Sequence, residues 1–148
     1  MSWLSGREIE VKIQRNADFA TRQAFYGICA MDHLPFAVPQ YPFIMIVNTQ
    51  SHNLPGEHWI SVYMDKYHRA EVFDPLALPV PKRLLTWLNQ FSRSITSNHL
   101  MFQHPLSSQC GAFAIHYVLH RLHTSKMTYS SSVMSNETFI HNFYNRLK

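Results

Sequence analysis

The stretch Cys110-Gly-Ala-Phe-Ala-Ile-His-Tyr-Val-Leu-His-Arg-Leu-His123 decides the fold, because it is apolar on nearly every side. A helix without a polar face is buried at the centre of a domain. The preceding segment, Pro105-Leu-Ser-Ser-Gln109, is irregular in composition, so we expect the helix to begin at Cys110. The sequence therefore predicts a buried central helix with a cysteine at its N-terminus.

Runs rich in β-branched and aromatic residues predict strands at 42–48, 58–64, 69–74 and 98–103. Residues 65–68 suit a hairpin turn between the second and third of these strands. Apolar periodicity predicts helices at 4–15, 81–93 and 136–147, and a further helical piece at 17–28, while three prolines make 33–42 a loop. We predict an α+β fold, with a central mixed, mostly antiparallel sheet flanked by helices.

Composition favours one domain over residues 1–148, with 46% apolar and 15% charged residues and no repeat or linker. The longest apolar run, Phe43–Val47, is too short to cross a bilayer, and no secretory signal is visible at the N-terminus. The short apolar run leads us to expect no membrane partner. Two cysteines cannot make a disulfide framework, so we expect a reducing compartment.

Charge is divided unevenly between the two halves of the chain. Residues 1–74 hold six Lys and Arg against eight Asp and Glu, a net charge of −2. Residues 75–148 hold seven Lys and Arg against the single acid Glu137, a net charge of +6. This asymmetry is compatible with polyanion binding and equally with a basic surface that only aids solubility.

Cys110 is the strongest candidate for chemistry. A thiol at a helix N-terminus lies at the positive end of the helix dipole, which stabilises the thiolate that acts as a nucleophile. Gly111 follows directly and would let a substrate backbone approach closely. The alternative is a buried, inert cysteine, which is the commoner role of a free cysteine.

His58 and Asp74 are the candidate base and its orienting acid. If 58–64 and 69–74 form a hairpin, both residues lie at its open end on neighbouring strands. An aspartate that binds one imidazole nitrogen fixes the tautomer that presents the other nitrogen to the sulfur. Glu71 competes for the role of the acid, but it falls on the opposite face of the strand from Asp74.

Gln103 is the candidate oxyanion donor, seven residues before Cys110 and within reach of the sulfur through a short loop. Its amide and a backbone N–H could stabilise the negative oxygen of a tetrahedral intermediate. An ordinary exposed glutamine is the alternative.

Two further features leave alternatives open. His116, His120 and His123 share a helix face that could ligate Zn²⁺, although core or solvated histidines explain them better. Trp59 could shield the site from water or simply pack in a strand.

The chain resembles the adenovirus protease (adenain) family of cysteine endopeptidases, and more distantly the SUMO-deconjugating proteases. The matching stretches are PFIMIVNTQSHNLPGEHWISVY, EVFDPLALP and LMFQHPLSSQCGAFAIHYVLHR, which lie between about Tyr26 and Arg121. The resemblance implies that Cys110 is the nucleophile, His58 the base, Asp74 its acid and Gln103 the oxyanion donor.

By this resemblance the protein is a cysteine endopeptidase that cleaves viral or capsid precursor proteins next to glycine. The implied location is the virion and the nucleus or cytoplasm of the infected cell, and we expect a monomer. An isopeptidase that removes ubiquitin-like modifiers and a catalytically inactive basic binding module are the alternatives.

Departures from the family concern its activators and its C-terminus. The adenovirus enzymes are stimulated by DNA and by a peptide disulfide-linked to a cysteine between the acid and the glutamine. Residues 75–102 contain no cysteine, so we expect no disulfide-linked peptide cofactor. No cofactor or metal is expected for the chemistry, whereas DNA should bind with little sequence preference and an affinity that falls with salt. Only 38 residues follow Cys110, fewer than in the adenovirus enzymes.

Overall fold

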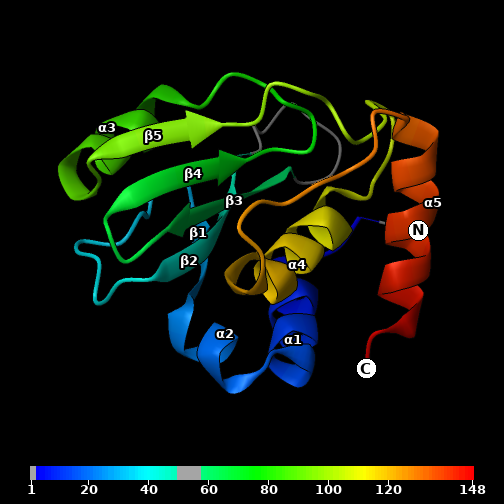
Figure 1. Ribbon diagram of the computed structural model, residues 1–148, viewed down its shortest axis with the longest axis horizontal. Helices are drawn as coiled ribbons and strands as arrows, with labels where there is room; N and C mark the ends of the chain where they lie inside the picture. The colour runs from blue at the N-terminus through cyan, green and yellow to red at the C-terminus, as the bar shows by residue number, and fades with distance from the viewer. Residues whose placement is uncertain (1–2, 50–57) are drawn as a thin grey trace.

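The computed structural model describes residues 3–49 and 58–148, so most of the segment between the predicted strands 42–48 and 58–64 lies outside the described residues. The described residues form five helices, five strands and a short 3₁₀ turn at Arg121–His123, arranged as in Figure 1. The helices are α1 (Gly6–Asn16), α2 (Phe19–Ala24), α3 (Lys82–Phe91), α4 (Cys110–His120) and α5 (Val133–Arg146). The strands are β1 (Phe25–Ala30), β2 (Phe43–Asn48), β3 (Trp59–Met64), β4 (Arg69–Phe73) and β5 (Ser94–Ser97).

The five strands form one mixed sheet in the order β1-β2-β3-β4-β5. Antiparallel pairing is confined to the three central strands, while β1 and β5 each run parallel to their neighbour. The hairpin expected at 58–74 is present, with Ser61 opposite Phe73 and Met64 opposite Ala70. The α+β fold with a central mixed sheet is therefore confirmed.

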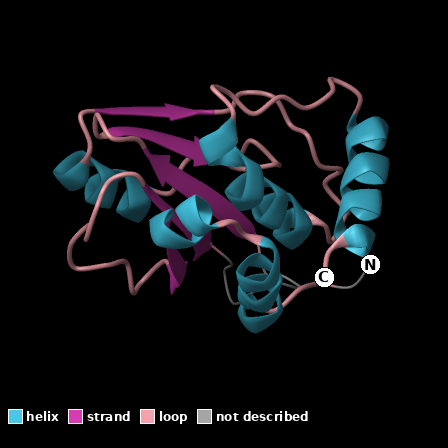
Figure 2. Ribbon diagram, turned by 60° about the horizontal axis from the view of Figure 1, so that its bottom comes forward, coloured by secondary structure: helices cyan, strands magenta, loops and turns pink. Residues whose placement is uncertain are grey.

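Helices cover the two faces of the sheet unequally. On one face, α3 packs against alternate strand side chains through its buried residues Leu84, Trp87 and Leu88. On the other face lies α4, which α1 and α5 contact in turn (Figures 1 and 2). No helix in the described part of the chain is both long and apolar enough to cross a membrane.

The all-round apolar sequence of α4 is explained by this arrangement, because its neighbours leave almost no exposed surface. The nine residues from Cys110 to Val118 are all buried. Gly111 lies against α1, and a Cβ added there would come within 3.2 Å of side-chain carbons of Leu4 and Ile9. Gly111 is therefore explained by the close approach of the N-terminal segment, not by the approach of a substrate.

The C-terminal part of α4 is joined to the sheet by polar contacts around Glu71 on β4. The Arg121 Nε donates to Glu71 Oε1 at 2.8 Å, and the buried Tyr117 hydroxyl donates to the same oxygen. Burial raises the pKa of the Tyr117 hydroxyl, and the neighbouring Glu71 charge adds to that rise, so the phenol stays a donor. The helix is thus held in a fixed position along β4.

Three element predictions are wrong. The helical piece at 17–28 ends at Ala24, because β1 begins at Phe25 and Gly27 has a φ of 136°, which no helix accommodates. The last strand is Ser94–Ser97 and residues 98–103 are irregular, since Pro75 ends β4 and leaves them no strand to pair with. The C-terminal helix begins at Val133, capped by Ser132, and not at Asn136.

Candidate active site

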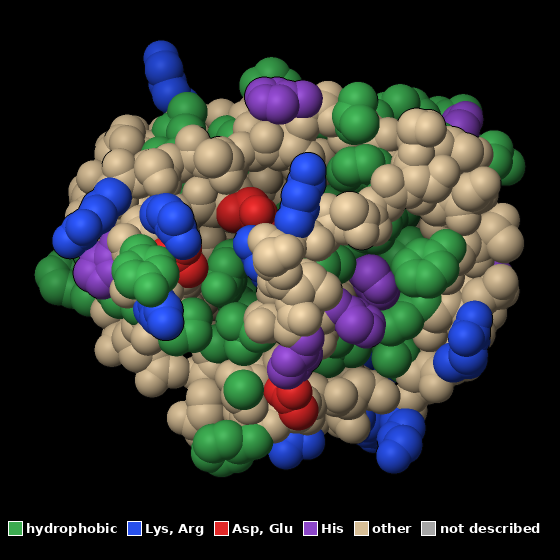
Figure 3. Space-filling view, viewed as in Figure 1, with side chains coloured by type: hydrophobic (Ala, Val, Ile, Leu, Met, Phe, Trp, Pro, Cys, Tyr) green, Lys and Arg blue, Asp and Glu red, His purple; other side chains and the backbone are tan. Residues whose placement is uncertain are grey.

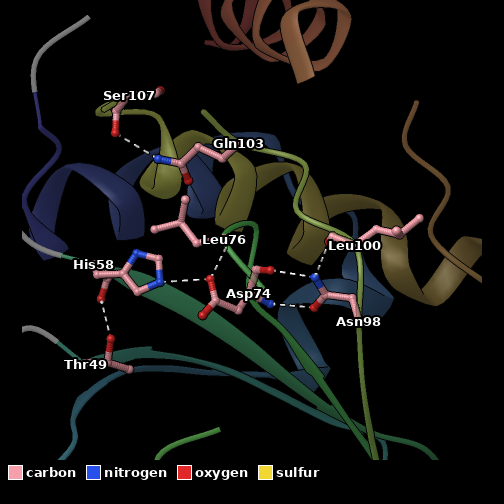
Figure 4. A network of polar contacts seen from close by, with 8 residues as sticks. All are labelled: Thr49, His58, Asp74, Leu76, Asn98, Leu100, Gln103 and Ser107. Carbon is pink, nitrogen blue, oxygen red and sulfur yellow. Dashed lines mark hydrogen bonds and ion pairs between the residues drawn. The ribbon is translucent and has the colours of Figure 1, made fainter. Parts of the chain in front are cut away.

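His58 and Asp74 meet at the open end of the β3–β4 hairpin, as the sequence predicts. The imidazole Nε2 donates to Asp74 Oδ1 at 2.9 Å (Figure 4). The hairpin explains this contact, because His58 immediately precedes β3 and Asp74 immediately follows β4. Both side chains are shielded from water, with exposed fractions of 14% and 10%.

The aspartate begins a tight turn that limits its motion. Asp74 Oδ1 also accepts the backbone N–H of Leu76 at 2.8 Å, and the Asp74 carbonyl accepts the N–H of Ala77 at 2.8 Å. Ala77 follows with a left-handed φ of 51°, which costs free energy in a residue with a Cβ. Pro75 inside the turn restricts the backbone further. The carboxylate is consequently held toward His58.

Cys110 begins α4 and hydrogen-bonds to His58. Because Nε2 of the imidazole bonds to Asp74, Nδ1 is the ring nitrogen that remains to hydrogen-bond the sulfur. Burial lowers the pKa of His58, but the hydrogen bonds and negative charges of Asp74 and Cys110 raise it by more, to about 9. The site therefore favours the imidazolium form of His58 at neutral pH.

Gln103 is buried beside the start of α4, with an exposed fraction of 1%. Its Nε2 donates to the Ser107 carbonyl at 2.9 Å, which uses one of the two amide hydrogens and fixes the orientation of the group (Figure 4). Its Oε1 is buried without a hydrogen-bond partner among the described residues. A buried unsatisfied acceptor costs about 1–3 kcal/mol, and such groups call for a functional explanation.

The segment 98–103 connects the acid to the amide. The Pro75 carbonyl accepts the backbone N–H of Phe102 at 2.8 Å and that of Gln103 at 3.0 Å. The position of Gln103 is therefore tied directly to the turn that begins at Asp74. The structure thus brings Cys110, His58 and Asp74 together. Gln103 is linked to the turn at Asp74, and it lies in a loop and not at a strand end.

Chemically, the arrangement pairs a nucleophile with a base and an oriented acid. The sulfur is fully buried, since Cys110 has an exposed fraction of 0%. The sulfur is therefore shielded from water in this structure. Exclusion of water strengthens the charge interactions between the three groups.

The rival residues have other roles in the structure. Glu71 contacts Tyr117 and Arg121 as described above and does not form a pair with His58. Trp59 is 3% exposed, packs in the core and donates its Nε1–H to the Leu4 carbonyl at 3.2 Å. The second of the two alternatives for Trp59, strand packing, is the one that the structure shows.

The histidines of α4 and of the 3₁₀ turn that follows it do not converge on a metal site. His116 Nδ1 accepts from the Tyr129 hydroxyl at 2.7 Å, and burial, with His120 nearby, lowers the pKa of His116 to about 3. His120 donates to the His116 carbonyl, and His123 pairs with Asp18 at 2.6 Å. Within residues 3–49 and 58–148, no group of three or more His, Cys, Asp and Glu could hold a metal ion.

Two supporting contacts were not predicted from the sequence. Asn98 binds both backbone groups of Asp74, and Gln109, the residue before Cys110, donates to Glu137 Oε2 on α5 at 2.6 Å. Both depend on neighbours distant in sequence, so local composition carries no indication of them.

A cavity of about 520 Å³ lies beside the site but does not contain the reacting groups. It is bounded by β4, β5 and residues 125–127, with Phe73, Leu100 and Tyr117 among its apolar walls. Asn98 also lines it and is the lining residue that contacts Asp74. None of Cys110, His58, Asp74 and Gln103 lines this cavity.

Comparison with solved structures identifies the fold. The pS273R protease of ASFV superposes with a TM-score of 0.66 at 15% identity, over 99% of this chain and 68% of that one. The effector protein ChlaDUB of Chlamydia abortus gives a TM-score of 0.51 at 14% identity, over 95% of this chain and 76% of that one.

The central domain of the uncharacterized Lpg1148 protein from Legionella pneumophila gives a TM-score of 0.52 at 14% identity, over 98% of both chains. No protein-family model matches this sequence, and no curated protein matches it either. The chain has the fold of the adenain-like and SUMO-protease class of cysteine proteases, as its sequence resemblance implies.

The two candidate acids are distinguished by their effect on His58. We expect Asp74→Asn to lower the titration midpoint of His58 from about 9, because it removes a charge that favours the imidazolium. Glu71→Gln should leave that midpoint in place and lower the free energy of unfolding, because Glu71 pairs with Arg121 and Tyr117. Histidine NMR titration and chemical denaturation measure the two effects, and a shift caused by Glu71→Gln would contradict the assignment.

Proposed function

We propose that the protein is a cysteine peptidase in which Cys110 is the nucleophile, His58 the general acid–base and Asp74 its orienting acid. The observation that carries this proposal is the contact of one imidazole with both Cys110 and Asp74 at the start of a buried helix. The fold supports the proposal, because cysteine proteases use it. A structural cysteine requires neither a base nor an acid beyond the base.

The proposed reaction starts from a Cys110 thiolate beside a His58 imidazolium. The Cys110 thiolate attacks the carbonyl carbon of the scissile bond, and the imidazolium of His58 gives its proton to the departing amine. A thioester remains on the sulfur. Water then attacks the thioester, His58 takes a proton from it, and the thiolate leaves to restore the starting state.

The negative oxygen that forms in each step needs donors. We propose that the second amide hydrogen of Gln103 and the backbone N–H of Cys110, in the first turn of α4, supply them. The helix dipole favours negative charge at the same place. Gln103 thus acts in the transition state more than in substrate binding.

Protein substrates with glycine at the cleavage site are the proposed substrate class, and viral or capsid precursors are the proposed biological targets. The adenain-like resemblance and the likeness to the ASFV protease support this choice. An isopeptidase that acts on ubiquitin-like modifiers is the second candidate, and the likeness to ChlaDUB favours it.

A basic binding module without activity is less well supported. On the face shown in Figure 3, Lys and Arg side chains are dispersed and do not gather into one patch. The buried Cys110–His58–Asp74 arrangement would also have no use in such a module. Stimulation by DNA remains a proposal that rests on the +6 charge of residues 75–148.

The two cysteines provide a test with an internal control. We expect iodoacetamide at neutral pH to label Cys110 and not Cys29, because burial raises the pKa of the Cys29 thiol to about 11. Cys110→Ala should abolish peptide hydrolysis while the fold survives, and Cys29→Ala should retain it. Mass spectrometry of the labelled chain and a hydrolysis assay decide, and activity in Cys110→Ala would end the peptidase proposal.

Replacement of the amide tests the oxyanion role. Gln103→Ala should lower kcat by about 10²–10³ with KM nearly unchanged, because the lost donor acts on the transition-state oxygen. Steady-state kinetics on a peptide substrate measure both constants. A rise in KM as large as the fall in kcat would make Gln103 a substrate-binding residue instead.

A substrate panel separates peptidase from isopeptidase. We expect peptides with Gly-Gly before the scissile bond to be hydrolysed faster than matched peptides with alanine there, since little side chain fits at a buried sulfur. Fluorogenic peptides and ubiquitin- and SUMO-type conjugates should be compared at equal concentration. Faster cleavage of a conjugate than of every peptide would favour the isopeptidase.

A further inference from the structure

The side chain of Asn98 pairs with both backbone groups of the triad acid. Its Oδ1 accepts the Asp74 N–H at 2.9 Å, and its Nδ2 donates to the Asp74 carbonyl at 2.6 Å (Figure 4). The same Nδ2 donates to the Leu100 carbonyl at 3.1 Å. Three hydrogen bonds thus fix the amide, and two of them go to one residue.

This contact continues the sheet beyond the end of its backbone ladder. The parallel pairing of β4 and β5 ends where Val72 lies opposite Ser97. Pro75 has no N–H, and its carbonyl accepts the backbone N–H groups of Phe102 and Gln103, further along the chain than a continued ladder would place its partner. A primary amide offers the same donor and acceptor as a peptide group, so the Asn98 side chain replaces the missing strand at Asp74.

The consequence for the site is geometric. With its N–H and its carbonyl both held, Asp74 retains only its side-chain torsions, and the bond from Leu76 restricts these. Among the described residues, the charged and titratable groups that face His58 are Asp74 at the end of β4 and Cys110 at the start of α4. Any displacement of the Asp74 backbone therefore changes the 2.9 Å contact that keeps the imidazole charged.

We propose that Asn98 is a positioning residue of the active site, which acts by holding the Asp74 backbone so that the carboxylate stays bonded to His58. The catalytic meaning of this role rests on the proposed peptidase function, whereas the effect on His58 does not. Asn98 touches no reacting atom, so its loss should change the protonation of His58 and the turnover number, and not substrate binding.

Asn136 on α5 offers a matched control. It is buried and pairs with Ser130 in the same two-way manner, accepting its N–H at 2.8 Å and donating to its carbonyl at 2.7 Å. It also donates to the Phe102 carbonyl at 3.2 Å. Loss of either asparagine side chain removes three backbone hydrogen bonds, but only Asn98 contacts the triad.

The test compares Asn98→Ala with Asn136→Ala in the full chain by histidine NMR titration, with His58 assigned through a His58→Gln variant. We expect both alanine variants to unfold at lower temperature. Asn98→Ala should also move the His58 midpoint down from about 9 toward that of Asp74→Asn, and weaken the resonance of the Nε2 proton shared with Asp74. Asn136→Ala should leave both signals as in the parent chain.

Turnover gives the second measurement. Loss of a residue that orients a catalytic group typically costs about 10- to 100-fold in activity. We expect Asn98→Ala to lower kcat on that scale at pH 7 with an unchanged KM. If Asn98→Ala does not fold, Asn98→Gln keeps the amide but displaces it by one methylene, and a smaller shift in the same direction is expected.

The outcomes separate this inference from the proposed function. A His58 midpoint that is the same in the parent chain, Asn98→Ala and Asn98→Gln would overturn the positioning role. A His58 midpoint that shifts in Asn98→Ala would support the positioning role. If Cys110 of the parent chain then neither reacts with iodoacetamide nor hydrolyses any peptide, the peptidase proposal is overturned and the positioning role stands. An equal shift in Asn136→Ala would show that general loosening of the fold is the cause.

Discussion

The burial of α4 between the sheet and the two terminal helices is the constraint on which the site depends. Because the helix has almost no exposed surface, its position along the sheet is fixed by packing at Gly111 and by the Glu71 contacts near its end. That position places Cys110 beside the open end of the β3–β4 hairpin. The nucleophile belongs to one layer and its base and acid to another, so core packing aligns them.

The parts of the site that follow from local rules were predictable from the sequence. An all-round apolar segment after an irregular one predicts a buried helix that begins at Cys110, and a hairpin with a short turn predicts that His58 and Asp74 meet. Alternation along β4 also separates Glu71 from Asp74 correctly. These inferences need only periodicity and strand pairing.

What could not be predicted depends on where one segment finds its partner. Residues 98–103 have the composition of a strand, yet Pro75 removes the partner, and Asn98 pairs through its side chain instead. Residues 25–30 contain the β-branched and aromatic residue types of a strand. They join the sheet only through parallel pairing with β2, and local sequence does not predict that pairing. Non-local pairing is therefore the missing information in both cases.

The enclosure of the reacting groups makes the charge of His58 depend on its two partners. A buried imidazolium loses its hydration, and the pKa of His58 is nevertheless raised because Asp74 and Cys110 both stabilise the charge. The pair works only if the carboxylate cannot turn away, since a buried charge that loses its partner is costly. The turn at Asp74 and the bonds of residues 98–103 to it meet that requirement. Because the same residues end at Gln103, the amide that would face the oxyanion is held by the contacts that hold the acid.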